Sequence, residues 1–199
     1  MTRDRLEAFS DGVFSVAATL LVLDIKLADV QVSSNSQLNA RLMESMPNIL
    51  TFVFTFLVVG VFWVGHLRIL SNVKKASHYL IWSNIFYLLT IAIIPFAAAL
   101  LAKHPFYITS VIFYSIVLFL CGIQHVILLG YLNHHKSLLE KPPAPTAFKK
   151  SMLIALTGPV CYVLAAFSCL FYLPVSFLFI LAALAFYIFL IPRFLKNNS

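Results

Sequence analysis

The sequence has few charged residues and too little polar surface for a soluble domain. Only 11% of its 199 residues are charged and 61% are hydrophobic, whereas a soluble domain has about 25% charged and about 45–50% apolar residues. This imbalance excludes an ordinary water-soluble fold and leaves no length for a separate soluble domain. We therefore expect residues 1–199 to form a single all-α domain embedded in a membrane.

The signatures of enzymes and of metal or disulfide sites are also missing. The sequence has no GxSxG motif, no phosphate-binding P-loop and no paired glycines of a dinucleotide fold. Its three cysteines form no CxxC pair and lie in apolar runs, where cysteine packs as a small hydrophobic residue. The histidines lack HExxH or CxxH spacing. We therefore expect no enzymatic activity, no bound metal and no cofactor.

Positive charge is in excess, with 14 Lys and Arg against 7 Asp and Glu. No basic stripe or recognition fold indicates nucleic-acid binding, so we expect none. The basic residues instead lie in short stretches between apolar runs, which is the pattern that membrane topology produces. The positions of the basic residues therefore indicate how the chain is oriented in the membrane.

Six apolar runs are long enough to cross a bilayer, which takes about 20 residues in a helix. Pro47, Pro105 and Pro174 precede the second, fourth and sixth runs, and proline favours the first turn of a helix. The fifth and sixth runs are joined by almost nothing, which predicts a tight helical hairpin. The predicted spans are residues 8–28, 48–68, 79–101, 106–131, 151–171 and 175–192.

Two connecting segments stand out between these runs. After the first run, Leu38, Leu42, Met43 and Met46 share one helical face, and we expect a short helix lying on the outer surface. The segment at 133–150 is the longest inner loop, and its prolines are expected to end any helix there.

The distribution of Lys and Arg predicts the orientation of the spans. With the N-terminus inside, 11 of these residues lie on the inner side and 3 on the outer side, as the positive-inside rule requires. Both ends of the chain are then cytoplasmic. Because charge runs straight into the first span without a small-residue cleavage site, we expect no removed signal peptide. The three basic residues predicted on the outer side are Lys26, Arg41 and Lys103.

Ionisable residues inside membrane spans are functional candidates, because lipid makes an unpartnered charge costly. Asp24 and Lys26 lie near the outer interface and can snorkel. Asp11 lies about two turns into the first run, and His66 and Asn84 lie at comparable depth on the next two. We expect a polar cluster that clamps the helices, serves function, or does both. Its members are Arg5, Ser10, Asp11, His66 and Asn84.

A helical wheel at about 100° per residue shows a stripe on the first run. Phe14, Ala18, Leu21 and Ile25 lie opposite this stripe, and Asp11 lies to one side. Periodicity alone favours ordinary helix packing, but the stripe also suits a narrow pore whose aliphatic rings exclude water. The stripe comprises Gly12, Val16, Thr19, Leu20, Leu23 and Leu27.

The segment RLEAFSDGVFSVAATLLVLDI at 5–25 resembles the first helix of the transmembrane-protein-175 potassium-channel family. Its R-x-x-x-F-S-D pattern is matched by Arg5, Phe9, Ser10 and Asp11. The resemblance extends over the whole chain. Its weaker elements are FWVGH, which contains Trp63 and His66 and resembles an aromatic-Trp-x-x-His pattern, and the third run with Asn84 and IIPF at 93–96.

The resemblance implies a prokaryotic, single-repeat member with six transmembrane helices per subunit, assembled as a homotetramer. The first helix of each subunit would line a central potassium-conducting pore without the Thr-Val-Gly-Tyr-Gly filter, which is also missing here. Thr19 matches a hydroxyl ring linked to cation selectivity. The constriction would involve Val16, Leu20 and Leu23, with Leu27 continuing the stripe. A structural network is implied for Arg5, Phe9, Ser10, Asp11, Trp63, His66 and Asn84.

The expected function is that of a passive, potassium-selective leak channel in a bacterial inner membrane. Its partners would be potassium ions, lipids and further copies of the chain. The alternative is a proton or weakly selective cation channel, in which Asp11 and the inner histidines relay protons. A secondary transporter would show internal repeats and broken helices, and only Gly158-Pro159 suggests such a break. A non-catalytic membrane scaffold remains a further alternative.

Overall fold

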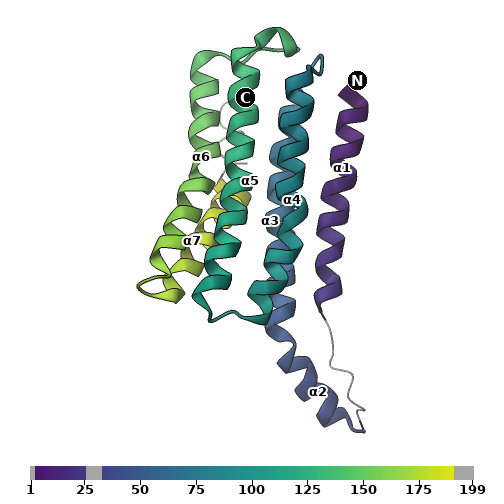
Figure 1. Cartoon of the computed structure of the whole chain (residues 1–199), viewed down its shortest axis with the longest axis vertical. Helices are drawn as coiled ribbons and strands as arrows, with labels where there is room; N and C mark the ends of the chain where they lie inside the picture. The colour runs from purple at the N-terminus through teal and green to yellow at the C-terminus, as the bar shows by residue number, and fades with distance from the viewer. Residues whose placement is uncertain (1–2, 26–32, 191–199) are drawn as a thin grey trace.

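The computed structural model describes residues 3–25 and 33–190 and shows a bundle of helices (Figure 1). The first three α-helices are α1 (Arg3–Leu20), α2 (Asn35–Glu44) and α3 (Met46–Leu70). They are followed by α4 (His78–Lys103), α5 (Ile108–His134), α6 (Pro145–Ser168) and α7 (Leu173–Ala185). Two short 3-10 helices, η1 (Leu21–Asp24) and η2 (Lys136–Leu138), follow α1 and α5, and a π-helical segment, η3 (Phe186–Leu190), extends α7.

Among the described residues, five helices are long and apolar enough to cross a membrane. The chain is therefore a multi-pass membrane protein. The sixth predicted span corresponds to a shorter apolar helix, Leu173–Phe189, and its predicted end at 191–192 lies outside the described residues. The five longer helices are Arg3–Leu23, Met46–Leu70, His78–Lys103, Ile108–His134 and Pro145–Ser168.

Prolines mark several helix starts, but not all of those predicted. Pro47 and Pro174 occupy the first turns of α3 and α7, as expected. The start predicted at Pro105 is wrong, because a hydrogen-bonded turn from His104 to Tyr107 (3.2 Å) intervenes before α5 begins.

The loop predicted at 133–150 is shorter than expected. Helix α6 begins at Pro145, not at residue 151. A proline in the first helical turn loses no hydrogen bond, because that N–H has no partner within the helix. The last proline of this segment therefore starts a helix instead of excluding one.

The short helix predicted after the first span is present as α2. Its first turn is capped by Ser34, whose hydroxyl accepts a hydrogen bond from a backbone N–H at 3.2 Å. Leu38, Leu42 and Met43 are exposed, whereas Met46 already belongs to α3. Helix α2 projects beyond one end of the bundle (Figure 1).

Neighbouring helices pack in a continuous series across the bundle. Helix α4 packs on α5, α5 on α6 and α6 on α7, while α1 packs against α3 and α4. Tyr87 of α4 and Tyr114 of α5 are fully buried in the middle of this series. Helix α1 lies at one side of the bundle (Figure 1), so one of its faces is covered and the other is open.

The end of the bundle where α1 begins, called here the inner end, is fastened by a clasp around Asn72. The Asn72 amide nitrogen donates to the carbonyl of Lys141 (2.8 Å), and its side-chain oxygen accepts from the Lys141 N–H (3.0 Å). The Asn72 carbonyl accepts from the N–H of Glu140 (2.9 Å). Arg3 lies 3.4 Å from Glu7 and 3.8 Å from Glu140. The clasp therefore links the α3–α4 turn, the loop after α5 and the start of α1.

Candidate functional site

The covered face of α1 is defined by residues spaced at helical intervals. Leu6, Ser10, Phe14, Ala17 and Leu21 are all buried, and their spacing of three or four residues places them on one side of the helix. The ring of Phe14 lies 5.3 Å from that of His66 on α3 and 6.1 Å from that of Tyr87 on α4. These contacts fix the rotation of α1 about its own axis.

A buried chain of hydrogen bonds joins α1, α4 and α3 next to these rings. The amide nitrogen of Asn84 donates to the Ser10 hydroxyl oxygen (3.0 Å), and Ser10 donates to the carbonyl of Leu6 (2.8 Å). Asn84 Oδ1 lies 2.6 Å from His66 Nε2. Because Oδ1 can only accept, the proton of His66 is on Nε2. The side chains of Ser10, Asn84 and His66 thus each have a partner on a neighbouring helix.

Asp11 belongs to a separate contact. Trp63 on α3 donates its indole N–H to Asp11 Oδ1 at 2.8 Å. Both side chains are partly accessible, with Trp63 39% exposed. The structure therefore brings Ser10, Asn84 and His66 together in one group and Asp11 and Trp63 in another.

Two members of the implied network lie apart from both groups. Phe9 is 54% exposed, and Arg5 is also exposed. Within residues 3–25 and 33–190, no ion pair involves Arg5. In a single subunit, both side chains therefore face outward from α1.

The stripe found on the wheel forms the open face of α1. Val16 is 56% exposed, Leu20 44% and Leu23 64%, and Thr19 is also exposed. The Thr19 hydroxyl donates back to its own helix, 2.9 Å from the carbonyl of Ser15. A hydroxyl oxygen has acceptor lone pairs in addition to its single proton, so Thr19 still offers partial negative charge on this face.

The winding of α1 changes at the end of this face. After Leu20 the chain continues as η1, a 3-10 helix, in which side chains three residues apart eclipse one another. Leu23 therefore stays aligned with Leu20. The last predicted member of the stripe, Leu27, lies outside the described residues.

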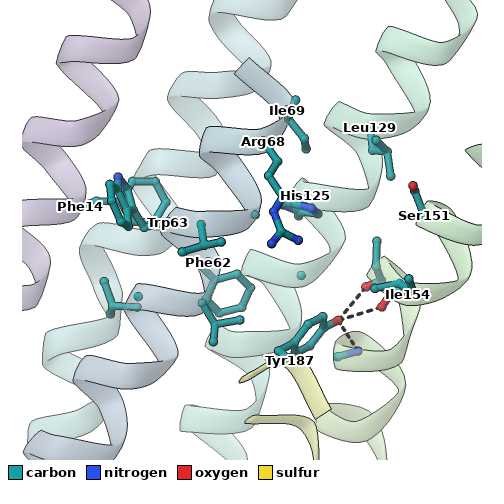
Figure 2. Close-up of a pocket in the computed structure, with 18 of the residues that line it drawn as sticks. Phe14, Phe62, Trp63, Arg68, Ile69, His125, Leu129, Ser151, Ile154 and Tyr187 are labelled. Atoms are coloured by element: carbon teal, nitrogen blue, oxygen red, sulfur yellow. Dashed lines mark hydrogen bonds between the residues drawn. The ribbon is translucent and has the colours of Figure 1, made fainter. Parts of the chain in front are cut away.

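A cavity of about 1070 Å³ borders α3 and reaches Asp11, Phe14 and Ser15 of α1 at one side. Figure 2 shows Arg68 and His125 within it, with Tyr187 at its lower side. The Tyr187 hydroxyl lies 3.0 Å from the carbonyl of Ile154 and accepts from the N–H of Gly158 (2.9 Å). Sequence reasoning missed this cavity. Its signal was the Gly158-Pro159 pair, which marks a helix with freed backbone groups.

Gly65 permits a close approach of α3 and α5 beside the cavity. A Cβ atom at this position would lie 2.9 Å from Cε1 of His125, closer than real contacts allow. Only glycine leaves room for the imidazole here. Within the part of the chain that the structure describes, no cluster of His, Cys, Asp or Glu suits a metal ion.

Comparison with known proteins gives a consistent group of relatives. The family model of the endosomal/lysosomal potassium channel TMEM175 matches residues 5–95. A protein of Chryseobacterium sp. (strain P1-3), named as a potassium channel, is 32% identical over 128 residues, which are 64% of this chain and 64% of that protein. The human endosomal/lysosomal proton channel TMEM175 is 27% identical over 181 residues, 87% of this chain and 35% of that protein. The chain thus spans less than two thirds of these curated relatives.

A solved structure agrees with the whole fold. It is described as a lysosomal potassium-selective channel TMEM175 homolog from Chamaesiphon minutus, and it matches with a TM-score of 0.80 and 26% sequence identity. The match covers 99% of this chain and 98% of that one. The helical architecture is therefore shared over the full length, beyond the residues that the family model reaches.

Proposed function

We propose that this chain, which belongs to the TMEM175 family, is the subunit of a passive potassium channel whose pore is lined by the open face of α1. One observation carries the proposal. The open face of α1 presents Gly12, Ser15 and Thr19 among its aliphatic residues, and small and hydroxyl residues are enriched where membrane helices meet one another. Such residues suit contact with other helices or with water.

The position of α1 at one side of the bundle (Figure 1) suits assembly around an axis. In a homotetramer, four copies of α1 would face one another and enclose a narrow pore between the subunits. A closed ring of identical subunits leaves no copy of this face exposed to lipid. We propose a bacterial inner membrane as the location, and the positive-inside rule predicts that both ends of each chain are cytoplasmic.

The residues of the open face would have different roles in such a pore. Four Thr19 hydroxyls would offer acceptor oxygens to a partly dehydrated cation, in place of the backbone carbonyls of a conventional filter. The rings of Val16, Leu20 and Leu23 would expel water and set the barrier to conduction. Ser10, His66 and Asn84 would hold α1 at the required rotation without touching the ion.

A proton channel is the second candidate, because the human relative carries that name. Asp11 is only partly buried and lies on the same helix as the proposed pore face. Its carboxylate is a possible proton carrier. The two candidates predict different permeant ions through the same helix.

The test is ion flux through vesicles that contain the purified full-length protein. With a potassium gradient and a proton ionophore present, we expect potassium efflux that empty vesicles do not show. With potassium replaced by an impermeant cation and a pH gradient imposed, we expect no change in internal pH. Proton flux without potassium flux would establish the second candidate, and flux of neither ion would refute both.

A matched pair of variants tests whether α1 contains the gate. Leu20→Asn wets the constriction and should raise potassium flux about tenfold, which corresponds to roughly 1.4 kcal/mol off the barrier. Leu89→Asn makes the same change on the exposed face of α4 and should leave flux unchanged. Equal flux through Leu20→Asn and the unmodified protein would contradict a constriction at this level.

A further inference from the structure

The cavity beside α3 runs from the inner end of the bundle toward its middle. It extends from Leu139 and Phe148 near the inner end to Gly158 and Tyr187 deeper in the bundle, and α5 forms one of its walls (Figure 2). At about 1070 Å³ it matches the largest small-molecule pockets, which reach about 1,000 Å³. Its long form and mostly apolar walls suit a hydrocarbon chain.

A single cationic side chain enters this cavity without a carboxylate partner. In Figure 2 the Arg68 side chain points from α3 into the space beside His125. None of the ion pairs within residues 3–25 and 33–190 involves Arg68. Asp11 also borders the cavity, but at its α1 side, where Trp63 donates to it. The guanidinium is therefore available to an anion.

The chain near the inner end of the cavity is also positively charged. Residues 132–152, which connect α5 and α6 and begin α6, include four lysines and one acid, Glu140. Basic pockets between membrane helices on the cytoplasmic side are typical binding sites for anionic lipid head groups. A guanidinium also binds phosphate with two parallel hydrogen bonds.

The deep part of the cavity requires no polar ligand. Pro159 lacks an N–H and so leaves the carbonyl of Ala155 without its usual helical donor. Tyr187 supplies a hydroxyl 3.3 Å from that oxygen and 3.0 Å from the carbonyl of Ile154, and it accepts from the N–H of Gly158. The Gly158 N–H has a partner, and the two carbonyls share the single hydroxyl proton of Tyr187. An apolar chain can therefore lie against this part of the wall.

One buried polar atom beside Arg68 does lack a partner. His125 Nδ1 has no hydrogen bond among the described residues, and His125 lines the cavity (Figure 2). Buried polar atoms in native proteins are normally paired. Arg68 and His125 together thus mark the level at which a ligand would present its polar atoms.

We propose that this cavity binds an anionic phospholipid of the inner leaflet, with the lipid phosphate at Arg68 and one acyl chain extending toward Tyr187. The ester region of the lipid lies beside His125. At α1 this site borders Asp11 and Ser15. Its lining does not include Val16, Thr19 or Leu20, so it does not depend on which ion the protein conducts. A zwitterionic lipid with the same chains lacks the net charge that Arg68 selects.

The charge selectivity is tested by titrating the full-length protein in neutral detergent with two lipids that share their acyl chains. Native mass spectrometry counts bound lipid, and we expect phosphatidylglycerol to bind about fivefold more tightly than phosphatidylcholine. Arg68→Gln should abolish this preference and Arg68→Lys should keep most of it. Lys103→Gln removes a positive charge at the opposite end of the bundle and should change nothing.

The acyl part of the site has its own pair of variants. Ser151→Trp places a large ring in the cavity (Figure 2) and should weaken the binding of both lipids at least fivefold. Leu153→Trp makes the same addition to the same helix at a residue that is 61% exposed and lies outside the cavity lining. We expect it to bind both lipids normally.

Several outcomes would overturn the proposal. A phosphatidylglycerol preference retained in Arg68→Gln would place the selective site elsewhere. Inorganic phosphate that displaces the lipid at equal concentration would indicate an anion site without an acyl groove. A changed number of chains per assembly in Ser151→Trp, with lipid binding intact, would show that a second copy of the chain occupies the cavity.

Discussion

The open faces of α1 and α4 are both mostly apolar, but they differ in the size and polarity of their residues. The exposed residues of α4 include Trp82, Phe86 and Leu89, which are large and suit lipid chains. The exposed face of α1 mixes aliphatic residues with Gly12 and Thr19. Small and hydroxyl residues are enriched where membrane helices meet one another. A residue that is exposed in a single subunit therefore faces either lipid or another helix, and the size and polarity of the residue distinguish the two cases.

The largest difference should appear when the same charge is placed on both faces. Leu89→Lys puts an ammonium group into lipid near the middle of α4 and should destabilise the inserted protein by about 2.5–3.5 kcal/mol. In the proposed tetrameric channel, Val16→Lys should cost less, because the pore would supply water, yet it should nearly abolish potassium flux by placing four positive charges in that pore. Thermal unfolding in lipid nanodiscs and vesicle flux measure the two effects. Equal destabilisation would show that both faces meet lipid.

A second prediction concerns the buried hydrogen bonds of Asn84, which fix the rotation of α1 and so the direction of its open face. Asn84→Leu keeps the side-chain size but leaves His66 and Ser10 without the amide, which should cost about 2 kcal/mol in the free energy of unfolding. Thr51→Val removes a hydroxyl that bonds only within its own exposed helix turn, at 2.9 Å from the carbonyl of Pro47. Its cost should stay below about 0.5 kcal/mol. Denaturant titration in mixed micelles compares the two, and similar costs would remove the special role of the buried chain.

The smallest expected effect is on selectivity. Thr19→Ala removes the hydroxyl from the open face and should lower the potassium-over-sodium permeability ratio about fivefold, or roughly 1 kcal/mol. Thr157→Ala removes a hydroxyl with a similar bond to its own helix, at 3.2 Å from the carbonyl of Leu153, and should leave the ratio unchanged. Bilayer recordings under bi-ionic conditions measure both. An unchanged ratio in Thr19→Ala would exclude this hydroxyl from ion selection.

The sequence predicted the helices and the faces of α1 because both follow from local periodicity. Phe14 and Leu21 lie on the covered face and Val16 and Leu20 on the open one, as the wheel arranged them. The start of α6 was predicted wrongly because Pro145 was treated as a helix terminator. A proline gives the same local signal at either side of a helix boundary, and only the neighbouring backbone decides between them.

Contacts between distant helices were predictable only where polar residues at similar depth had few possible partners. His66 and Asn84 were expected to meet on this ground, and they do. Depth in the membrane alone did not pair Asp11 with Trp63, because an indole N–H is a small part of a mostly apolar side chain. The family resemblance had placed both residues in one network. Tyr187 was likewise overlooked as a partner of the helix near Pro159, since nothing local connects residues 29 positions apart.

The clasp around Asn72 has a practical consequence for building reporters into this protein. The polypeptide between α5 and α6 is divided by it into a fastened part, up to Lys141, and the prolines that follow before α6 begins at Pro145. A fluorescent domain inserted at 142–144 would leave the paired amides of Asn72 and Lys141 intact. The same insertion two residues earlier would fall beside Glu140 and disturb its 3.8 Å contact with Arg3, which links the beginning of α1 to this loop.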